Sequence, residues 1–407
     1  MADSIALPTR FDRVALTGAL VTLVGAAVFP FVELRANRLV PGSVHSLAAA
    51  GPWAFVVWGV IALAFVSAVG PSAKARAAAS TAGAYGLVAV TAWALGAAAE
   101  RLLADMTPVA RVSVGGGAWV MLVGAAILGF AGAEERSRFV LRRAAPIALL
   151  VIAVVGAVVA GGLDRISLAR EFAVRQEQFV SLILGHLAIT GASLAAGAAV
   201  GVPLGLLAAR NRRARAVALA VTGVIETIPS LALLGLLVVP LAALGAAVPW
   251  LRELGVRGIG PAPGFIALTL YSLLPIVRNT YVGLSSVDPA AIDAGRGMGM
   301  SRRQLLFRVE LPLAAPLVLE GLRVAAVLLT GIATLTVFAG ARTLGILIFE
   351  GLGQFAPDLI LLGALPTIVL AVIADVGMSA LARAVTPRGV RVAVQAPAPT
   401  FAEEAAA

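Results

Sequence analysis

Residues 288–312 read DPAAIDAGRGMGMSRRQLLFRVELP and separate two long apolar runs of the chain. Asp288 is a good helix N-cap, and the proline that follows it suits the first helical position. Gly299 interrupts the helix, because glycine adopts backbone angles that other residues avoid. Ser301 and Gln304 have the spacing of a capping box, which starts a second helix. The stretch therefore predicts two short helices joined by a hinge.

Apolar runs flank this stretch and recur along the whole chain. Hydrophobic residues make up 60% of the 407 positions and charged residues only 13%, whereas soluble proteins carry about 25% charged residues. A membrane-spanning helix needs roughly 20 apolar residues, and the alternation typical of a membrane β-barrel is absent. We therefore predict an all-α, polytopic membrane protein surrounded by lipid. The ten expected transmembrane helices are residues 14–32, 47–70, 77–99, 117–133, 144–163, 181–209, 216–245, 262–284, 311–340 and 359–384.

The positive charges are distributed unequally between the loops on the two sides of these segments. One set of loops holds nineteen Lys and Arg residues and the alternate set holds ten. Cytoplasmic loops carry the excess of Lys and Arg, so we expect the first set to be cytoplasmic. It includes residues 288–312 and both ends of the chain. The prediction is a multi-pass inner-membrane protein with both termini in the cytoplasm.

The chain is expected to divide at the polar connection 164–180, which we interpret as an external loop. The region before it, 1–163, holds five apolar segments with almost no internal polarity. The region after it, 181–385, holds five segments that contain Pro, Glu, Arg and Asp. Ionisable residues inside a membrane are costly and usually mark a working site, so function is expected in the second region. Residues 390–407 are predicted to be a disordered tail.

Part of the loop matches a known family pattern in residue type and spacing. The matching residues are Asp293, Ala294, Gly295, Gly299, Val309, Leu311 and Pro312. This pattern resembles the "EAA" loop of binding-protein-dependent ABC importer permeases, in which the loop forms a coupling helix that sits in a groove of the ATPase subunit. The chain departs from the family with Asp for Glu at 293, Gly for Ala at 295 and Val for Ile at 309. The resemblance implies an ATPase-coupling role for the loop.

The resemblance extends over 181–385. Residues 225–234, 271–281 and 331–335 look like permeases of bacterial osmoprotectant importers, which take up glycine betaine, choline, carnitine and related compounds. The five additional N-terminal segments resemble those of longer permeases in one branch of that family. The implied partners are an ABC ATPase that binds ATP and Mg²⁺, a periplasmic or lipid-anchored solute-binding protein, and a second permease copy or paralogue. Another small zwitterion or amino-acid-like solute stays open as the substrate.

Several residues inside the expected membrane core are candidates for the translocation path or its gate. They are Glu226, Pro229, Ser230, Tyr271, Ser272, Pro275 and Arg278. Proline removes a helix hydrogen bond and frees the carbonyl four residues earlier, and such broken turns line cavities in transporters. The alternative for each proline is a packing kink. For the charged residues, and for Glu320, Arg323 and Asp375, the alternative is an internal ion pair or a snorkelling side chain.

Other classes of protein fit the sequence less well. It has no phosphate-binding GxxxxGK[ST] loop and no nucleophile elbow, so ATP chemistry is assigned to a separate subunit and the chain is not expected to be an enzyme. It has no cysteine and two distant histidines, so we expect neither a catalytic residue nor a metal site. The dispersed Lys and Arg residues do not indicate nucleic-acid binding. A secondary transporter with two inverted halves is the rival class, but the first half has no counterpart of the 288–312 loop.

Overall fold

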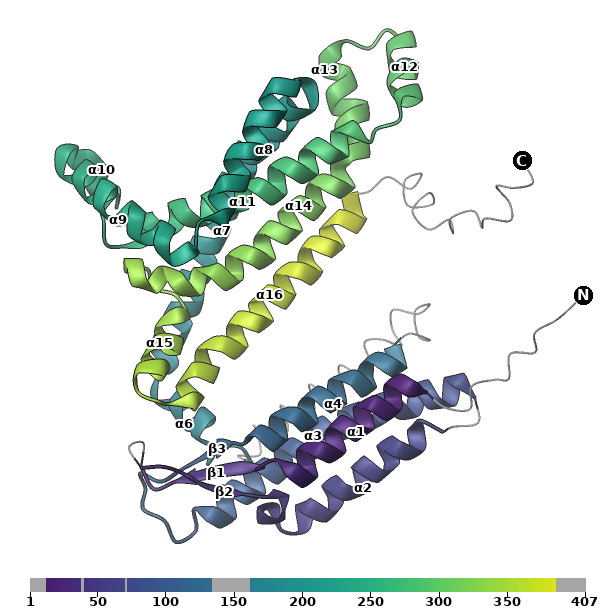
Figure 1. Cartoon of the computed structure of the whole chain (residues 1–407), viewed down its shortest axis with the longest axis vertical. Helices are drawn as coiled ribbons and strands as arrows, with labels where there is room; N and C mark the ends of the chain where they lie inside the picture. The colour runs from purple at the N-terminus through teal and green to yellow at the C-terminus, as the bar shows by residue number, and fades with distance from the viewer. Residues whose placement is uncertain (1–11, 38–39, 70–71, 134–161, 386–407) are drawn as a thin grey trace, which may run out of the picture. The chain divides into compact units, whose positions relative to one another are not determined.

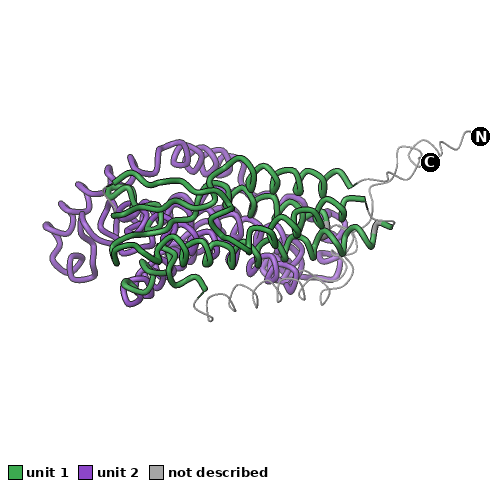
Figure 2. The backbone as a smooth tube through the Cα atoms, turned by 90° about the horizontal axis from the view of Figure 1, so that it is seen from below, with its two compact units in different colours: residues 1–175, 351–359 green, residues 176–350, 360–407 purple. Residues whose placement is uncertain are grey.

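The computed structural model describes residues 12–37, 40–69, 72–133 and 162–385. Most of the expected span 144–163 and the expected tail 390–407 lie outside these residues. The chain forms two compact units, which Figure 2 shows in different colours. Unit 1 contains residues 1–175 and 351–359, and unit 2 contains residues 176–350 and 360–407.

Four helices form most of unit 1 (Figure 1). They are α1 (Arg13–Val28), α2 (Pro52–Ser67), α3 (Ala73–Leu102) and α4 (Gly116–Ala133). Helix α1 begins where Asp12 accepts hydrogen bonds of 3.0 Å from the backbone N–H groups of Val14 and Ala15. Glycines let α1 and α4 approach closely, since a Cβ atom at Gly18 would lie 2.8 Å from Cγ of Leu128. Small residues permit such close contacts between membrane helices.

A three-stranded antiparallel sheet in unit 1 was not predicted. Its order is β2 (Ser43–His45), β1 (Val32–Arg35), β3 (Arg111–Val114), with Val32 opposite both His45 and Val114. The strands are only three or four residues long, so they carry little of the alternation that indicates a strand. The expected helical class is confirmed, because the sheet is a small addition to a helical protein.

The polar connection after this sheet is not the expected loop. Residues Ser167–Val174 form helix α6, and helix α7 already begins at Gln176. The side chain of Glu171 is buried in α6 and forms an ion pair with Arg111 of β3. A buried carboxylate needs such a partner. Glu171, one of the charged residues that suggested an exposed loop, therefore binds a short helix to the sheet through Arg111.

The turn between α15 and α16 also belongs to unit 1. The hydroxyl of Ser113 in β3 donates a hydrogen bond of 2.9 Å to the buried carboxylate of Asp358. The guanidinium of Arg35 in β1 donates to the backbone carbonyl of Phe355 over 3.2 Å. Residues 351–359 thus complete a unit whose other residues lie near the start of the chain.

Unit 2 consists almost entirely of helices. They are α7 (Gln176–Arg210), α8 (Arg212–Thr227), α9 (Ser230–Ala247), α10 (Pro249–Glu253), α11 (Pro261–Ser285), α12 (Pro289–Gly297), α13 (Arg302–Leu305), a π-helical turn (Leu306–Glu310), α14 (Leu311–Ile332), a 3-10 helix (Ala333–Ala339), α15 (Gly345–Gly353) and α16 (Pro357–Val385). The last residues of α15 and the first residues of α16 form the turn in unit 1. The prediction of one span over 216–245 was wrong, since α8 and α9 are separate helices. The short helix α15 was not predicted.

Helices α7 and α11 pack closely through glycines spaced four residues apart on α7. A Cβ atom at Gly197 would lie 1.8 Å from Oγ of Ser272, and one at Gly201 would lie 2.8 Å from Cγ2 of Ile276. Residues four apart share one helix face, so these glycines form a continuous groove for α11. The two helices are therefore the tightly packed centre of unit 2.

Six described helices or helical stretches are long and apolar enough to cross a membrane, and three shorter apolar helices lie in unit 1. The six are Lys74–Leu102, Gln176–Arg210, Ser230–Ala247, Pro261–Ser285, Arg302–Ala339 and Pro357–Val385. The shorter ones are Arg13–Val28, Pro52–Ser67 and Gly116–Ala131. A polytopic helical membrane protein is confirmed, and the number of ten spans stays a prediction.

Candidate functional site

The loop 288–312 has the expected helix, hinge and second helix start, and α12 and α13 project beyond the ends of α11 and α14 in Figure 1. The carboxylate of Asp288 accepts a hydrogen bond of 2.8 Å from the backbone N–H of Ala290, as an N-cap does. Gly299 has a φ angle of +76° at the hinge, a value that favours glycine. This geometry makes the loop an ordered projection.

The second helix starts with the predicted capping box. The backbone N–H of Gln304 donates to Oγ of Ser301 over 3.3 Å, and the backbone N–H of Ser301 donates to Oε1 of Gln304 over 2.8 Å. The α-helical part then lasts only four residues before the π-helical turn Leu306–Glu310. A π-helical turn inside a helix often marks a functional position. The sequence pattern did not reveal it.

Gly295 explains one departure from the family pattern. It is buried, and a Cβ atom there would lie 2.7 Å from Cδ1 of Leu305. Glycine thus lets α12 lie directly against α13. Asp293 on the same helix is exposed and forms an ion pair of 3.1 Å with Arg296. Exposed ion pairs contribute little to stability, so the Asp293 carboxylate is available to a partner.

The remaining loop residues divide into an exposed group and an inner group. Ala294 is exposed, whereas Val309, Leu311 and Pro312 are half-buried at the base of α14. Two large apolar side chains that we had not selected are exposed on the loop: Met298 at 71% and Phe307 at 57%. Exposed apolar side chains of this size on an ordered projection are typical of a docking surface. In the sequence, the only sign of this surface was the presence of these two large apolar residues within the loop 288–312.

The break at Pro229 is real, but its hydrogen bonding differs from the prediction. Helix α8 ends at Thr227 and α9 begins at Ser230. The Ile225 carbonyl, which we expected to be free, accepts a hydrogen bond of 3.2 Å from the N–H of Ile228. The Tyr271 hydroxyl of α11 donates instead to the carbonyl of Ile228. The structure therefore brings Tyr271 and the Pro229 break together.

Pro275 does not break its helix, since α11 runs from Pro261 to Ser285 without interruption. Ser272 and Pro275 are buried, and the Ser272 hydroxyl donates to the Thr269 carbonyl over 2.6 Å. Because Ser272 also lies against Gly197 of α7, this part of α11 belongs to the helix–helix contact. The packing interpretation fits both residues better than a gate.

The charged candidates fall into two groups. Arg323 of α14 pairs with Glu320 over 3.2 Å and with Asp375 of α16 over 2.7 Å. The first pair joins residues three apart on one helix face, and the second joins residues that are far apart in sequence; both fit the expected alternative of an internal ion pair. Glu226 and Arg278 are exposed, and neither has an ion-pair partner among the residues that the structure describes. The structure therefore does not bring Glu226 and Arg278 into an ion pair.

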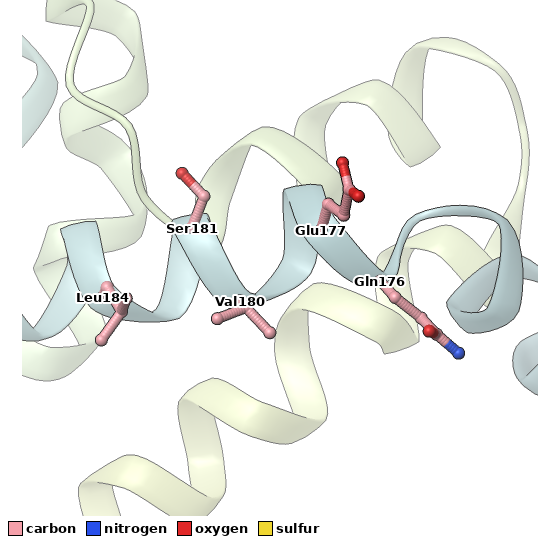
Figure 3. A pocket seen from close by; sticks show the side chains of 5 residues that line it. All are labelled: Gln176, Glu177, Val180, Ser181 and Leu184. Carbon is pink, nitrogen blue, oxygen red and sulfur yellow. The ribbon is translucent and has the colours of Figure 1, made fainter.

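A shallow hollow on α7 lies apart from these candidates (Figure 3). Its lining residues are Gln176, Glu177, Val180, Ser181 and Leu184. All five come from the first turns of one helix, so the hollow is part of a helix surface. It contains none of the predicted site residues.

Two family models match the chain. Residues 12–169 match the model described as "ABC transporter permease YehY, N-terminal domain". Residues 201–388 match the model described as "Binding-protein-dependent transport system inner membrane component". The second range contains the 288–312 loop and every candidate path residue.

Curated relatives align with about half of the chain. The carnitine transport permease protein OpuCB of Listeria monocytogenes is 38% identical over 51% of this chain and 87% of its own length. The glycine betaine/carnitine/choline transport system permease protein OpuCD of Bacillus subtilis is 44% identical over 47% of this chain and 76% of its own length. The osmoprotectant import permease protein OsmW of Salmonella typhimurium is 36% identical over 52% of this chain and 93% of its own length.

Among solved structures, an inward-facing MetNI methionine ABC transporter chain is 22% identical over 52% of this chain and 98% of its own length, with a TM-score of 0.45. The curated relatives, by contrast, are more than 30% identical and are covered over most of their length. On that evidence the chain belongs to the family of binding-protein-dependent transport system inner membrane components and is a permease of an ABC importer.

Proposed function

We propose that this permease imports osmoprotectants of the glycine betaine, carnitine and choline class. The names of the curated relatives, which include these solutes, support the proposal. Another small zwitterion or amino-acid-like solute is the alternative substrate for the same permease. Competition between solutes in an uptake assay distinguishes the two substrate classes. A secondary transporter would differ from an ABC importer because its uptake would not require ATP.

The loop 288–312 carries the mechanistic part of the proposal. In it an ordered helix pair exposes Asp293, Ala294, Met298 and Phe307 at one end of the permease. An ABC ATPase subunit, which binds ATP and Mg²⁺, would dock on this surface, with the Asp293 carboxylate offered to a cationic side chain. The chain itself supplies no step of ATP hydrolysis. Its part is to convert movement of the loop into movement of the helices.

The path assignment rests on the break between α8 and α9. Tyr271 holds the carbonyl of Ile228 beside the break, and Glu226 is exposed one residue before α8 ends. We assign Glu226, Pro229, Ser230 and Tyr271 to a gate that two permease copies or paralogues form together. Arg278 is exposed on the same helix as Tyr271 and is assigned to the edge of this path. A solute-binding protein would deliver substrate from the periplasmic side.

The test is transport by the reconstituted complex. The full chain, its ATPase and its binding protein are placed in lipid vesicles, and uptake of labelled glycine betaine is measured with and without ATP. The expected result is ATP-dependent uptake that carnitine or choline competes with and that histidine does not. Uptake driven by an ion gradient without ATP would contradict an importer. Competition by amino acids alone would overturn the substrate class.

A further inference from the structure

A partly buried ion pair joins the end of the coupling loop to helix α7. Glu310 is the last residue of the π-helical turn, and its side chain is only 4% exposed. Arg210, the last residue of α7, donates to the Glu310 carboxylate, and its own side chain is 52% exposed. A buried carboxylate is costly unless it is paired. Glu310 therefore fixes where the end of α7 lies relative to the loop.

An apolar cluster at the base of the loop joins several of the elements near this pair. The buried cluster consists of Leu284 in α11, Val287 in the connection between α11 and α12, and Ala314 in α14. Ile292 of α12 and Leu206 of α7 pack against it. Apolar contacts are non-directional, so they do not by themselves fix the orientation of the loop on α7. The ion pair adds a contact with a fixed geometry at the same place.

The position of the pair also connects the loop to the centre of unit 2. Helix α7 packs against α11 along its glycine face, where the Gly205 Cβ position lies 2.5 Å from Cβ of Thr280. Helices packed this closely move as one body, because a packed core is not continuously deformable. A movement of the end of α7 is thus passed to α11, which carries Tyr271 beside the Pro229 break.

We propose that Arg210 and Glu310 are positioning residues that transmit movement of the coupling loop to α7 and α11. Without the pair, a force on α12 would bend the π-helical turn at 306–310 instead of moving α7. The ATPase would still dock on the exposed loop surface and hydrolyse ATP. The inference rests on the proposed function of the loop, but it makes a separate claim about how the force leaves the loop.

The experiment measures solute transported per ATP hydrolysed in the reconstituted complex, with glycine betaine as the probe. The variants are Arg210→Ala, Glu310→Gln and the charge exchange Arg210→Glu with Glu310→Arg. Arg213→Ala is the matched control, because Arg213 is exposed near the same end of α7. Each single variant should keep the ATPase bound while the ratio falls at least about fivefold, the lower end of coupling between sites. The charge exchange should restore at least half of the ratio.

Three results would overturn the inference. The single variants could keep the wild-type ratio, they could lose the bound ATPase, or the charge exchange could fail to restore transport. Glu310→Gln keeps the test valid if Arg210→Ala does not fold, since it replaces a buried charge with a neutral group of the same shape. A wild-type complex without ATP-dependent uptake would instead refute the proposed function. The two failures are therefore distinguishable.

Discussion

Position 295 is the place where one missing methyl group shapes the coupling loop. Alanine in the family pattern would put Cβ 2.7 Å from Cδ1 of Leu305, the mobile end of a flexible side chain. A branched side chain has no such room. Glycine lets α12 and α13 touch without any shift of Leu305, although glycine is unfavourable in a helix by about 1 kcal/mol.

Gly295→Val should weaken binding of the ATPase, because overpacking of about 1–3 kcal/mol would separate α12 from α13. That free energy corresponds to a binding constant about tenfold weaker or more. Gly297→Val is the control, since a Cβ atom at Gly297 meets nothing within 4 Å. Copurification of the ATPase with each variant measures the effect. Equal retention by both variants would refute the packing argument.

Tyr271→Phe should destabilise the break between α8 and α9. The substitution removes the hydroxyl that donates to the Ile228 carbonyl, and an unsatisfied carbonyl costs about 1–3 kcal/mol. Thermal unfolding in detergent should show a lower midpoint, and uptake should fall. Tyr85→Phe in α3 controls for the loss of a hydroxyl elsewhere. Unchanged unfolding and uptake would remove Tyr271 from the gate.

At the scale of elements, the contact between α7 and α11 is expected to tolerate few substitutions. Gly201→Leu would push a side chain into Ile276, whose Cγ2 lies 2.8 Å from the Cβ position. This overpacking should lower the free energy of unfolding by about 1–3 kcal/mol or more. Gly191→Leu on the same helix should be neutral, because no atom lies within 4 Å of its Cβ position. Thermal unfolding midpoints of the two variants measure the difference, and equal midpoints would contradict the packing argument.

Capping and glycine patterns in the sequence predicted those elements that depend on residues close to one another in the chain. The N-cap at Asp288, the hinge at Gly299 and the Ser301–Gln304 capping box all depend on neighbours within a few residues, and all are confirmed. A broken turn at Pro229 was expected, but 216–245 was still predicted to be one span because apolar runs lie on both sides of the short stretch 226–230. The pair of Arg210 and Glu310 was missed because its residues are 100 positions apart. Only the folded chain brings them together.

At the scale of the whole molecule, orientation in the membrane remains a prediction from the charges. The chain lacks cysteine, so single cysteines can be labelled without removing others. Met298→Cys on the coupling loop and Leu254→Cys after α10 replace side chains that are 71% and 73% exposed. A membrane-impermeant maleimide on intact cells should label position 254 and leave 298 unlabelled until the cells are opened. The opposite pattern would reverse the topology.

The turn at 351–359 has a consequence for the order in which the chain is completed. Protein domains generally fold from the N-terminus while synthesis continues. Most of unit 1 precedes unit 2 in the chain, yet Asp358, the partner of Ser113, is synthesised only after residues 176–350 of unit 2. Until then β3 keeps an unpaired hydroxyl and the unit lacks one segment. Unit 1 is thus completed only after residues 176–350 of unit 2 have been synthesised.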